Sequence, residues 1–83
     1  MKLLYFAWVR EKTGISSEDV ELPENIQTIS DLIDWLITRG PEFEAAFSKR
    51  DVIRTAINQT HVQHDSSIAE AREIAFFPPV TGG

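Results

Sequence analysis

The sequence predicts an α+β fold in which a mixed sheet of four to five strands is covered on one face by one main helix. Three features indicate it: alternating side chains at the start of the chain, one amphipathic helix near the middle, and a final strand just before the C-terminus. Such a helix buries its apolar stripe on one face of the sheet, which gives two layers around a single core. The 83 residues form one domain near the lower size limit of chains that fold alone.

The first predicted strand covers residues 2–10. Successive strand side chains point to opposite faces, so its odd and even positions separate. The odd positions form a wholly apolar face that we expect in the core. They are Leu3, Tyr5, Ala7 and Val9. The even face begins and ends with a charge, and the residues between are Leu4, Phe6 and Trp8. This second face is either covered by other side chains or exposed as an apolar patch.

Residues 28–40 carry the strongest local pattern, that of one amphipathic helix. Five apolar residues recur at the helical spacing: Ile29, Leu32, Ile33, Leu36 and Ile37. Thr28 is a suitable N-cap, and Asp31 completes a short capping box. Gly40 is expected just after the helix, and Pro41 prevents its continuation. A turn at residues 11–14 and a strand at residues 19–22 precede this helix.

The second half of the chain predicts three more strands, at residues 52–58, 61–63 and 73–77. Short helical turns are expected at residues 42–47 and 66–71. With the last strand beside the first, this order of elements is the β-grasp arrangement. We therefore divide the chain into a β-grasp domain, residues 1–77, and an extended C-terminal diglycine tail, residues 78–83.

Composition excludes several classes of function. The chain has no cysteine, so disulfides, thiolate metal sites and cysteine nucleophiles are not available to it. A net charge of -5 argues against a nucleic-acid backbone as ligand. No apolar run approaches the roughly 20 residues that span a bilayer. No small-residue cleavage site follows the first apolar residues, and we expect a cytoplasmic protein.

The two histidines, His61 and His64, do not indicate a metal site, because no third ligand accompanies them. No glycine-rich phosphate loop and no recognisable catalytic triad is present. We therefore expect no metal, and no catalysis by the chain alone.

The end of the chain, AFFPPVTGG, is its most unusual stretch. Pro78 and Pro79 favour an extended backbone from Phe77 onward. Residues 78–83 can reach at most roughly 20 Å from the sheet. Gly82 and Gly83 have no Cβ, so the terminal carboxylate can enter a channel too narrow for other residues.

Two stretches carry a resemblance to a known family: YFAWVREKTG at residues 5–14, and INQTHV at residues 57–62 followed by AFFPPVTGG. The sequence resembles the small, sulfur-carrier subunit of molybdopterin synthase, a ubiquitin-like β-grasp family. The related thiamin-pathway carrier shares the fold and the diglycine but usually lacks the Phe-Pro-Pro lead-in. A ubiquitin-like modifier that forms isopeptide bonds through Gly83 is a further alternative. One departure lies at residues 69–72, which lack the glycine that the family usually has before the last strand.

The resemblance implies a mechanism in which Gly83 carries sulfur. A ubiquitin-activating-type adenylyltransferase would use ATP to adenylate its carboxylate, and a sulfur donor protein would convert it to a thiocarboxylate. The tail, Pro78, Pro79, Val80, Thr81 and Gly82, would then deliver the sulfur to cyclic pyranopterin monophosphate in the large subunit. No bound cofactor is implied for the carrier itself, and the expected assembly is a heterotetramer of two small and two large subunits.

The even face then has a use as the partner interface. Its expected residues are Phe6, Phe77, Leu4, Trp8 and His61. Exposed aromatic clusters commonly mark binding surfaces. The alternative is that the chain's own Phe43 and Phe47 cover part of this face. His61 stands where relatives often carry an apolar residue.

Overall fold

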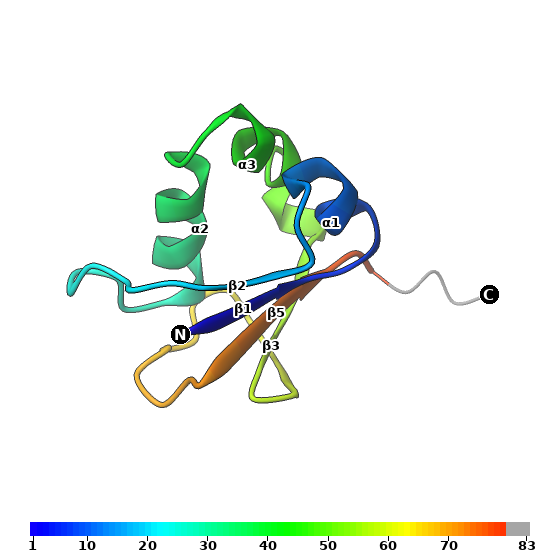
Figure 1. The fold of residues 1–83 in the computed structure, drawn as a ribbon. Helices are drawn as coiled ribbons and strands as arrows, with labels where there is room; N and C mark the ends of the chain where they lie inside the picture. The colour runs from blue at the N-terminus through cyan, green and yellow to red at the C-terminus, as the bar shows by residue number, and fades with distance from the viewer. Residues whose placement is uncertain (80–83) are drawn as a thin grey trace.

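The computed structural model describes residues 1–79 and shows a five-stranded sheet with helices on one side (Figure 1). The strands are β1 (Lys2–Tyr5), β2 (Ser17–Asp19), β3 (Arg54–Ile57), β4 (Thr60–Val62) and β5 (Glu73–Phe77). Their spatial order is β2-β1-β5-β3-β4. β1 and β5 are parallel, and the other neighbours are antiparallel. The last strand thus lies beside the first, and the β-grasp prediction is confirmed.

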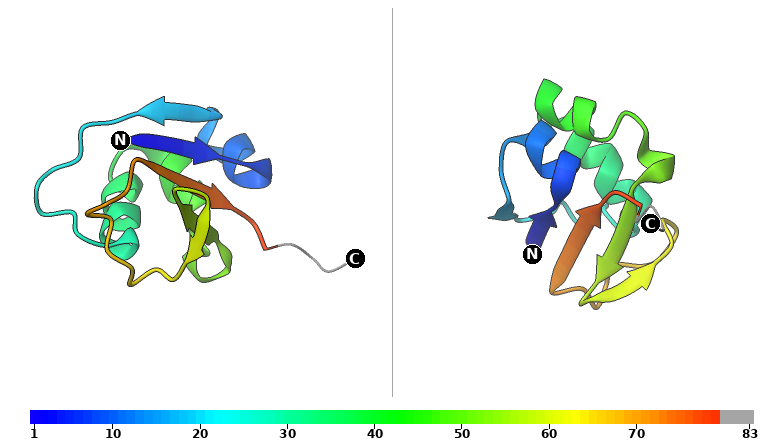
Figure 2. Two further views of the ribbon diagram at one scale, coloured as in Figure 1. Left: turned by 90° about the horizontal axis from the view of Figure 1, so that it is seen from below. Right: turned by 90° about the vertical axis from the view of Figure 1, so that its right-hand side faces the viewer.

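The helices are α1 (Ala7–Thr13), α2 (Ile29–Ile37) and α3 (Pro41–Ala46), with a short 3-10 helix η1 (Arg50–Val52) after them. α1, α2 and α3 lie on the same side of the sheet, as the two views of Figure 2 also show. The predicted capping box of α2 is present: Asp31 N–H donates to Thr28 Oγ1 at 3.1 Å, and Thr28 N–H donates to Asp31 Oδ2 at 3.2 Å. No helix in residues 1–79 is long and apolar enough to cross a membrane.

The prediction of one strand over residues 2–10 is wrong in its second half. β1 ends at Tyr5, and α1 begins at Ala7, whose backbone has a φ of 52°. Ala7 is therefore exposed rather than in the core, while Val9 is buried as expected. Trp8 lies on α1 and packs against the edge of the core. The prediction from alternating side chains was wrong here because Val9 can be buried by a helix as well as by a strand.

Three smaller predictions also need correction. The second strand is at residues 17–19 rather than 19–22, and α1 with its C-cap Gly14 occupies the expected turn at residues 11–14. Gly40 does not end α2, because Thr38 does so; Gly40 is instead the N-cap of α3, at a φ of 153°. Residues 66–71 form turns without a helix. The expected helical turn at residues 42–47 is confirmed as α3.

The core lies between the sheet and the three helices, and aromatic rings fill its centre. Phe76 stacks on Tyr5 with ring centroids 5.9 Å apart and meets Phe47 edge-on at 5.1 Å. Phe43 meets Tyr5 edge-on at 6.2 Å. Phe43 and Phe47 are thus buried on the helix side of the sheet and cannot cover its other face. The alternative in which these two rings cover the even face is wrong.

Candidate functional site

The face of the sheet that turns away from the helices carries side chains from four strands in register. One row crosses the sheet at paired positions: Leu4, Ala75, Ala56 and His61. These positions alternate along their strands with residues of the core. Both alanines have small, nearly buried side chains, so no side chain projects from the middle of the face. We call this surface the open face.

A second row of the open face lies at the end of β5. Phe77 pairs with Arg54 of β3. The Phe6 N–H donates to the Phe76 carbonyl at 3.1 Å, which extends the parallel β1–β5 ladder by one residue. Phe6 therefore occupies the position beside Phe77. Its side chain is 46% exposed, the most of any large apolar side chain in residues 1–79. An exposed ring in this row is available to a partner.

The ring of His61 reaches across β3 to the ring of Phe77. Their centroids are 5.2 Å apart, and the ring planes are inclined by 54°. The short side chain of Ala56 lies on the strand between them and leaves room for this contact. His61 thereby extends the apolar part of the open face to the outer strand, β4.

The opposite end of the open face is charged. Lys2 pairs with Glu73 on one side and with Asp19 on the other. The aromatic side chains of the face lie at the other end, where β5 finishes and the C-terminal segment begins, together with the exposed Arg54.

The start of the tail is fixed by the core beneath it. Phe76 is fully buried, whereas Phe77, Pro78 and Pro79 are half-buried. A buried ring immediately before the tail fixes the direction in which the chain leaves the sheet. The other tail residues that the sequence indicated lie outside the described residues; they are Val80, Thr81, Gly82 and Gly83.

A partly buried polar network supports β1 from the helix side. The Tyr5 hydroxyl donates to Glu18 Oε2 at 2.7 Å, and Arg39 donates two hydrogen bonds to the Glu18 carboxylate at 2.7 and 2.8 Å. Burial, together with the Glu18 hydrogen bond, raises the pKa of Tyr5 well above its ordinary value. Burial also raises the pKa of Glu18, but the hydrogen bonds from Arg39 and Tyr5 outweigh it, so this pKa is lowered. The Arg39 guanidinium also lies over the ring of Phe43, 4.7 Å from its centroid.

Asn58 is a structural residue that the sequence reasoning missed. It lies in the β3–β4 turn with a φ of 50°. Its Oδ1 accepts the backbone N–H groups of Arg72 at 2.9 Å and of Glu73 at 3.1 Å, and its Nδ2 donates to the Glu70 carbonyl at 3.1 Å. The segment before β5 therefore needs no glycine, because the Asn58 carboxamide holds it. The signal was an asparagine in a two-residue hairpin turn, where positive φ favours this residue type.

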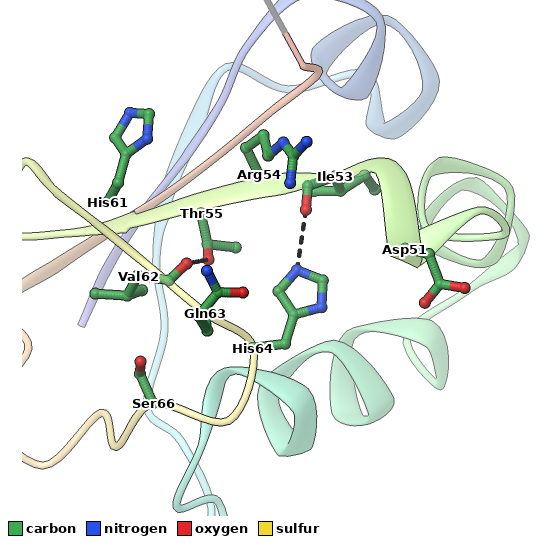
Figure 3. A pocket seen from close by; sticks show the side chains of 9 residues that line it. All are labelled: Asp51, Ile53, Arg54, Thr55, His61, Val62, Gln63, His64 and Ser66. Carbon is green, nitrogen blue, oxygen red and sulfur yellow. Dashed lines mark hydrogen bonds between the residues drawn. The ribbon is translucent and has the colours of Figure 1, made fainter.

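Both histidines line one groove of about 620 Å³, as Figure 3 shows. The His61 ring also contacts Phe77 on the open face, whereas His64 is bonded to the backbone next to η1. His64 Nε2 donates to the Ile53 carbonyl at 2.9 Å, and Thr55 Oγ1 donates to the Val62 carbonyl at 3.1 Å. Among residues 1–79 no group of three metal-ligating side chains is found. Two of the polar side chains that line the groove, Thr55 and His64, are thus already bonded to backbone carbonyls.

Comparison with known proteins decides the family. The model of the ThiS family matches residues 3–83 of the chain. The chain belongs to the ThiS family. Among the curated members of similar sequence, the molybdopterin synthase sulfur carrier subunit of Haemophilus influenzae is 35% identical over 83 residues. The alignment covers 100% of this chain and 99% of that relative. The subunit of the same name from Escherichia coli (strain K12) is 34% identical, with coverage of 100% and 99%.

The solved structures agree with this membership. The crystal structure of SAMP1 from Haloferax volcanii superposes on the chain with a TM-score of 0.72 at 26% identity. The superposition covers 100% of this chain and 98% of SAMP1. The predicted resemblance to the molybdopterin synthase sulfur carriers, and the ubiquitin-like β-grasp fold, are therefore confirmed.

Proposed function

We propose that this ThiS-family chain is the sulfur carrier subunit of a molybdopterin synthase, with the α-carboxyl group of Gly83 as the group that holds the sulfur. The observation that carries the proposal is an alignment that runs to the last residue, both with the family and with relatives of this name. A carrier of this kind needs a stable domain, a surface for its partners and a free terminal carboxylate. It needs no catalytic side chain of its own.

The chemistry takes place on the last carboxylate. An adenylyltransferase of the ubiquitin-activating type joins the Gly83 carboxylate to the AMP part of ATP and releases pyrophosphate. A sulfur donor protein then displaces AMP and leaves a thiocarboxylate. This sulfur is more polarizable than oxygen and attacks cyclic pyranopterin monophosphate held by the large subunit. Two carrier visits supply the two sulfurs of the dithiolene. ATP is thus a substrate of the activating enzyme, and the carrier itself binds no cofactor.

The large subunit docks on the open face. Phe6 and Phe77 are the proposed anchors, because aromatic side chains at the centre of an interface contribute most to affinity. Leu4 and His61 extend the contact along the first row. Trp8 lies outside the open face, because it is on α1 and packs against the core.

Because these anchors lie beside the tail, docking of the large subunit also brings the tail to its active site. A partner that covers Phe6 and Phe77 also surrounds the segment that follows, from Pro78 to Gly82. The two prolines limit the conformations of that segment and so lower the entropy that is lost on insertion. Glycine at the last two positions lets the carboxylate pass through a narrow channel. We propose two small and two large subunits in the complete assembly, acting in the cytoplasm.

The experiment that tests the proposal is reconstitution of sulfur transfer. The thiocarboxylated chain is mixed with the large subunit and cyclic pyranopterin monophosphate, and formation of the dithiolene product is measured. The chain should support product formation, and a variant lacking Gly83 should fold but give none. Product formation by that variant would contradict the role of Gly83. Recovery from cells of peptides joining Gly83 to lysines, with no transfer to the pterin, would favour a protein modifier instead. Rescue of a thiamin requirement, without rescue of molybdoenzyme activity, would favour the thiamin carrier.

A further inference from the structure

The junction between β1 and α1 has an unusual backbone. Ala7 adopts a φ of 52°, in the left-handed region that side chains with a Cβ rarely occupy. The other non-glycine residues of positive φ in the described chain, Asn58 and Gln59, form the β3–β4 hairpin turn, where such values are usual. Ala7 lies in no hairpin. Strained backbone of this kind is concentrated at functional positions, and it persists only where the surrounding structure holds it.

The surroundings of Ala7 hold it from both sides. On the strand side, the Phe6 N–H donates to the Phe76 carbonyl at 3.1 Å. On the helix side, the Phe6 carbonyl accepts the N–H groups of Val9 at 3.1 Å and of Arg10 at 3.3 Å. Phe6 itself is extended, with φ -124° and ψ 154°. The chain thus changes from strand to helix within one residue, and the change in direction falls on Ala7.

The consequence is a fixed backbone position from which the Phe6 ring projects. Both backbone polar groups of Phe6 are bonded, and its side chain is 46% exposed at the row that begins the tail. An exposed ring on a freely moving backbone would lose entropy when a partner covers it. A ring on a backbone that is already fixed loses less. Glycine would relieve the strain at position 7, but it would also widen the set of conformations that the junction can adopt.

We propose that Ala7 is a positioning residue, whose left-handed backbone holds the Phe6 ring beside the base of the tail for docking of the large subunit. This inference rests on the proposed function, because it assigns Phe6 to the partner interface. The alternative is a purely structural junction, in which the strain serves only to place α1 over the core. The two accounts differ in what removal of the strain does to docking.

The test compares Ala7→Gly with the parental chain in three measurements: the free energy of unfolding, the Kd for the large subunit, and the rate of sulfur transfer at saturating carrier. Glycine accepts positive φ, so the variant should fold with a stability close to that of the parent. We expect its Kd to rise about fivefold, the cost of immobilising one further side chain at an interface. The saturated transfer rate should remain that of the parent, because the tail is unchanged.

Two further variants separate positioning from structure. Gln59→Gly relieves a positive φ of 72° at the opposite end of the sheet and should leave the Kd unchanged. In a Phe6→Ala background, the effect of Ala7→Gly on the Kd should disappear, because there is no ring left to position. An unchanged Kd for Ala7→Gly would overturn the inference, as would an equal rise with and without the Phe6 ring.

The outcome can be distinguished from a failure of the proposed function. If the parental chain does not bind the large subunit, the proposed function fails before any variant is compared. The mobility of the Phe6 ring in the free chain, measured by NMR relaxation, then tests the positioning role by itself. We expect greater mobility in Ala7→Gly than in Gln59→Gly, and equal mobility in the two would overturn the role.

Discussion

Asn58 and Glu73 are joined by two hydrogen bonds that fasten the β3–β4 turn to the start of β5. The Asn58 backbone N–H donates to the Glu73 carbonyl at 2.9 Å, and the Glu73 N–H donates to Asn58 Oδ1 at 3.1 Å. β5 is the strand that leads to the tail. A side chain in one turn therefore fixes where the functional strand begins.

Asn58→Ala should lower the free energy of unfolding by about 2 kcal/mol, because it removes three side-chain hydrogen bonds. In addition, alanine adopts the positive φ of this turn position less readily than asparagine does. Chemical denaturation measures the loss. Asn58→Gly is the matched control, since it accepts the positive φ but lacks the carboxamide. It should be less destabilised than the alanine variant. If both variants had the same free energy of unfolding as the parental chain, the carboxamide hydrogen bonds would contribute nothing to stability.

Acid should unfold the chain partly through Glu18. Its pKa is lower in the folded state than the ordinary value of 4.5, so the folded chain binds this proton less readily than the unfolded chain. The stabilisation is present above pH 4.5 and is lost as the pH falls through the folded pKa. Glu18→Gln should cost about 1 kcal/mol near neutral pH and make stability less dependent on pH below 4.5. Denaturation curves at several acidic pH values check this, and equal slopes for both chains would exclude Glu18 as a contributor.

Alkali should act through Tyr5. Its pKa is raised above the ordinary value of 10.0, mainly by burial, so the unfolded chain loses this proton first as the pH rises. The contribution of Tyr5 to the free energy of unfolding is complete below pH 10.0 and decreases above it. Tyr5→Phe keeps the ring packing on Phe76 and should remove this alkaline decrease. Unfolding measured between neutral and strongly alkaline pH tests the point. A variant that loses stability with pH as steeply as the parent would contradict it.

Phe77→Ala should weaken binding of the large subunit by about thirtyfold, the effect of truncating a central aromatic anchor. Val52→Ala is the matched control, because Val52 is an apolar residue exposed by 42% that lies on η1 rather than on a strand of the open face. It should bind as the parent does. Titration calorimetry with the purified large subunit gives both constants. Equal affinities of the two variants would remove the open face from the docking account.

Much of the fold could be predicted from the sequence, because its strongest signals are local. The stripe of α2, its Thr28–Asp31 capping box and the final strand depend on neighbours in the chain, and the structure confirms all three. Residues 6–13 could not be predicted correctly. The alternation of buried and exposed residue types in this segment is also compatible with a short helix, and the residue type alanine does not indicate a positive φ. Only the ladder bond of Phe6 and the packing of α1 select the helix.

The candidate site was predictable to a similar degree. Strand parity placed Leu4, Phe6 and Phe77 on the open face, where the structure has them, and His61, expected at the interface, lies on the same face. Parity placed Trp8 there wrongly, since the strand ends before it. The contact between His61 and Phe77 depends on a register across three strands, and the role of Asn58 depends on a distant turn. Long-range relationships of this kind cannot be read from local pattern.

The most direct test of the account is the intact mass of the chain after incubation with an adenylyltransferase of the ubiquitin-activating type, ATP and a sulfur donor. The account predicts that one oxygen is replaced by sulfur at Gly83, and that a variant with one residue added after Gly83 keeps its original mass. The molybdopterin synthase sulfur carrier subunit of Escherichia coli, treated in the same way, serves as the positive control. An unchanged mass of the parental chain, or sulfur acquired by the extended variant, would contradict the claim that this carboxylate is the carrier.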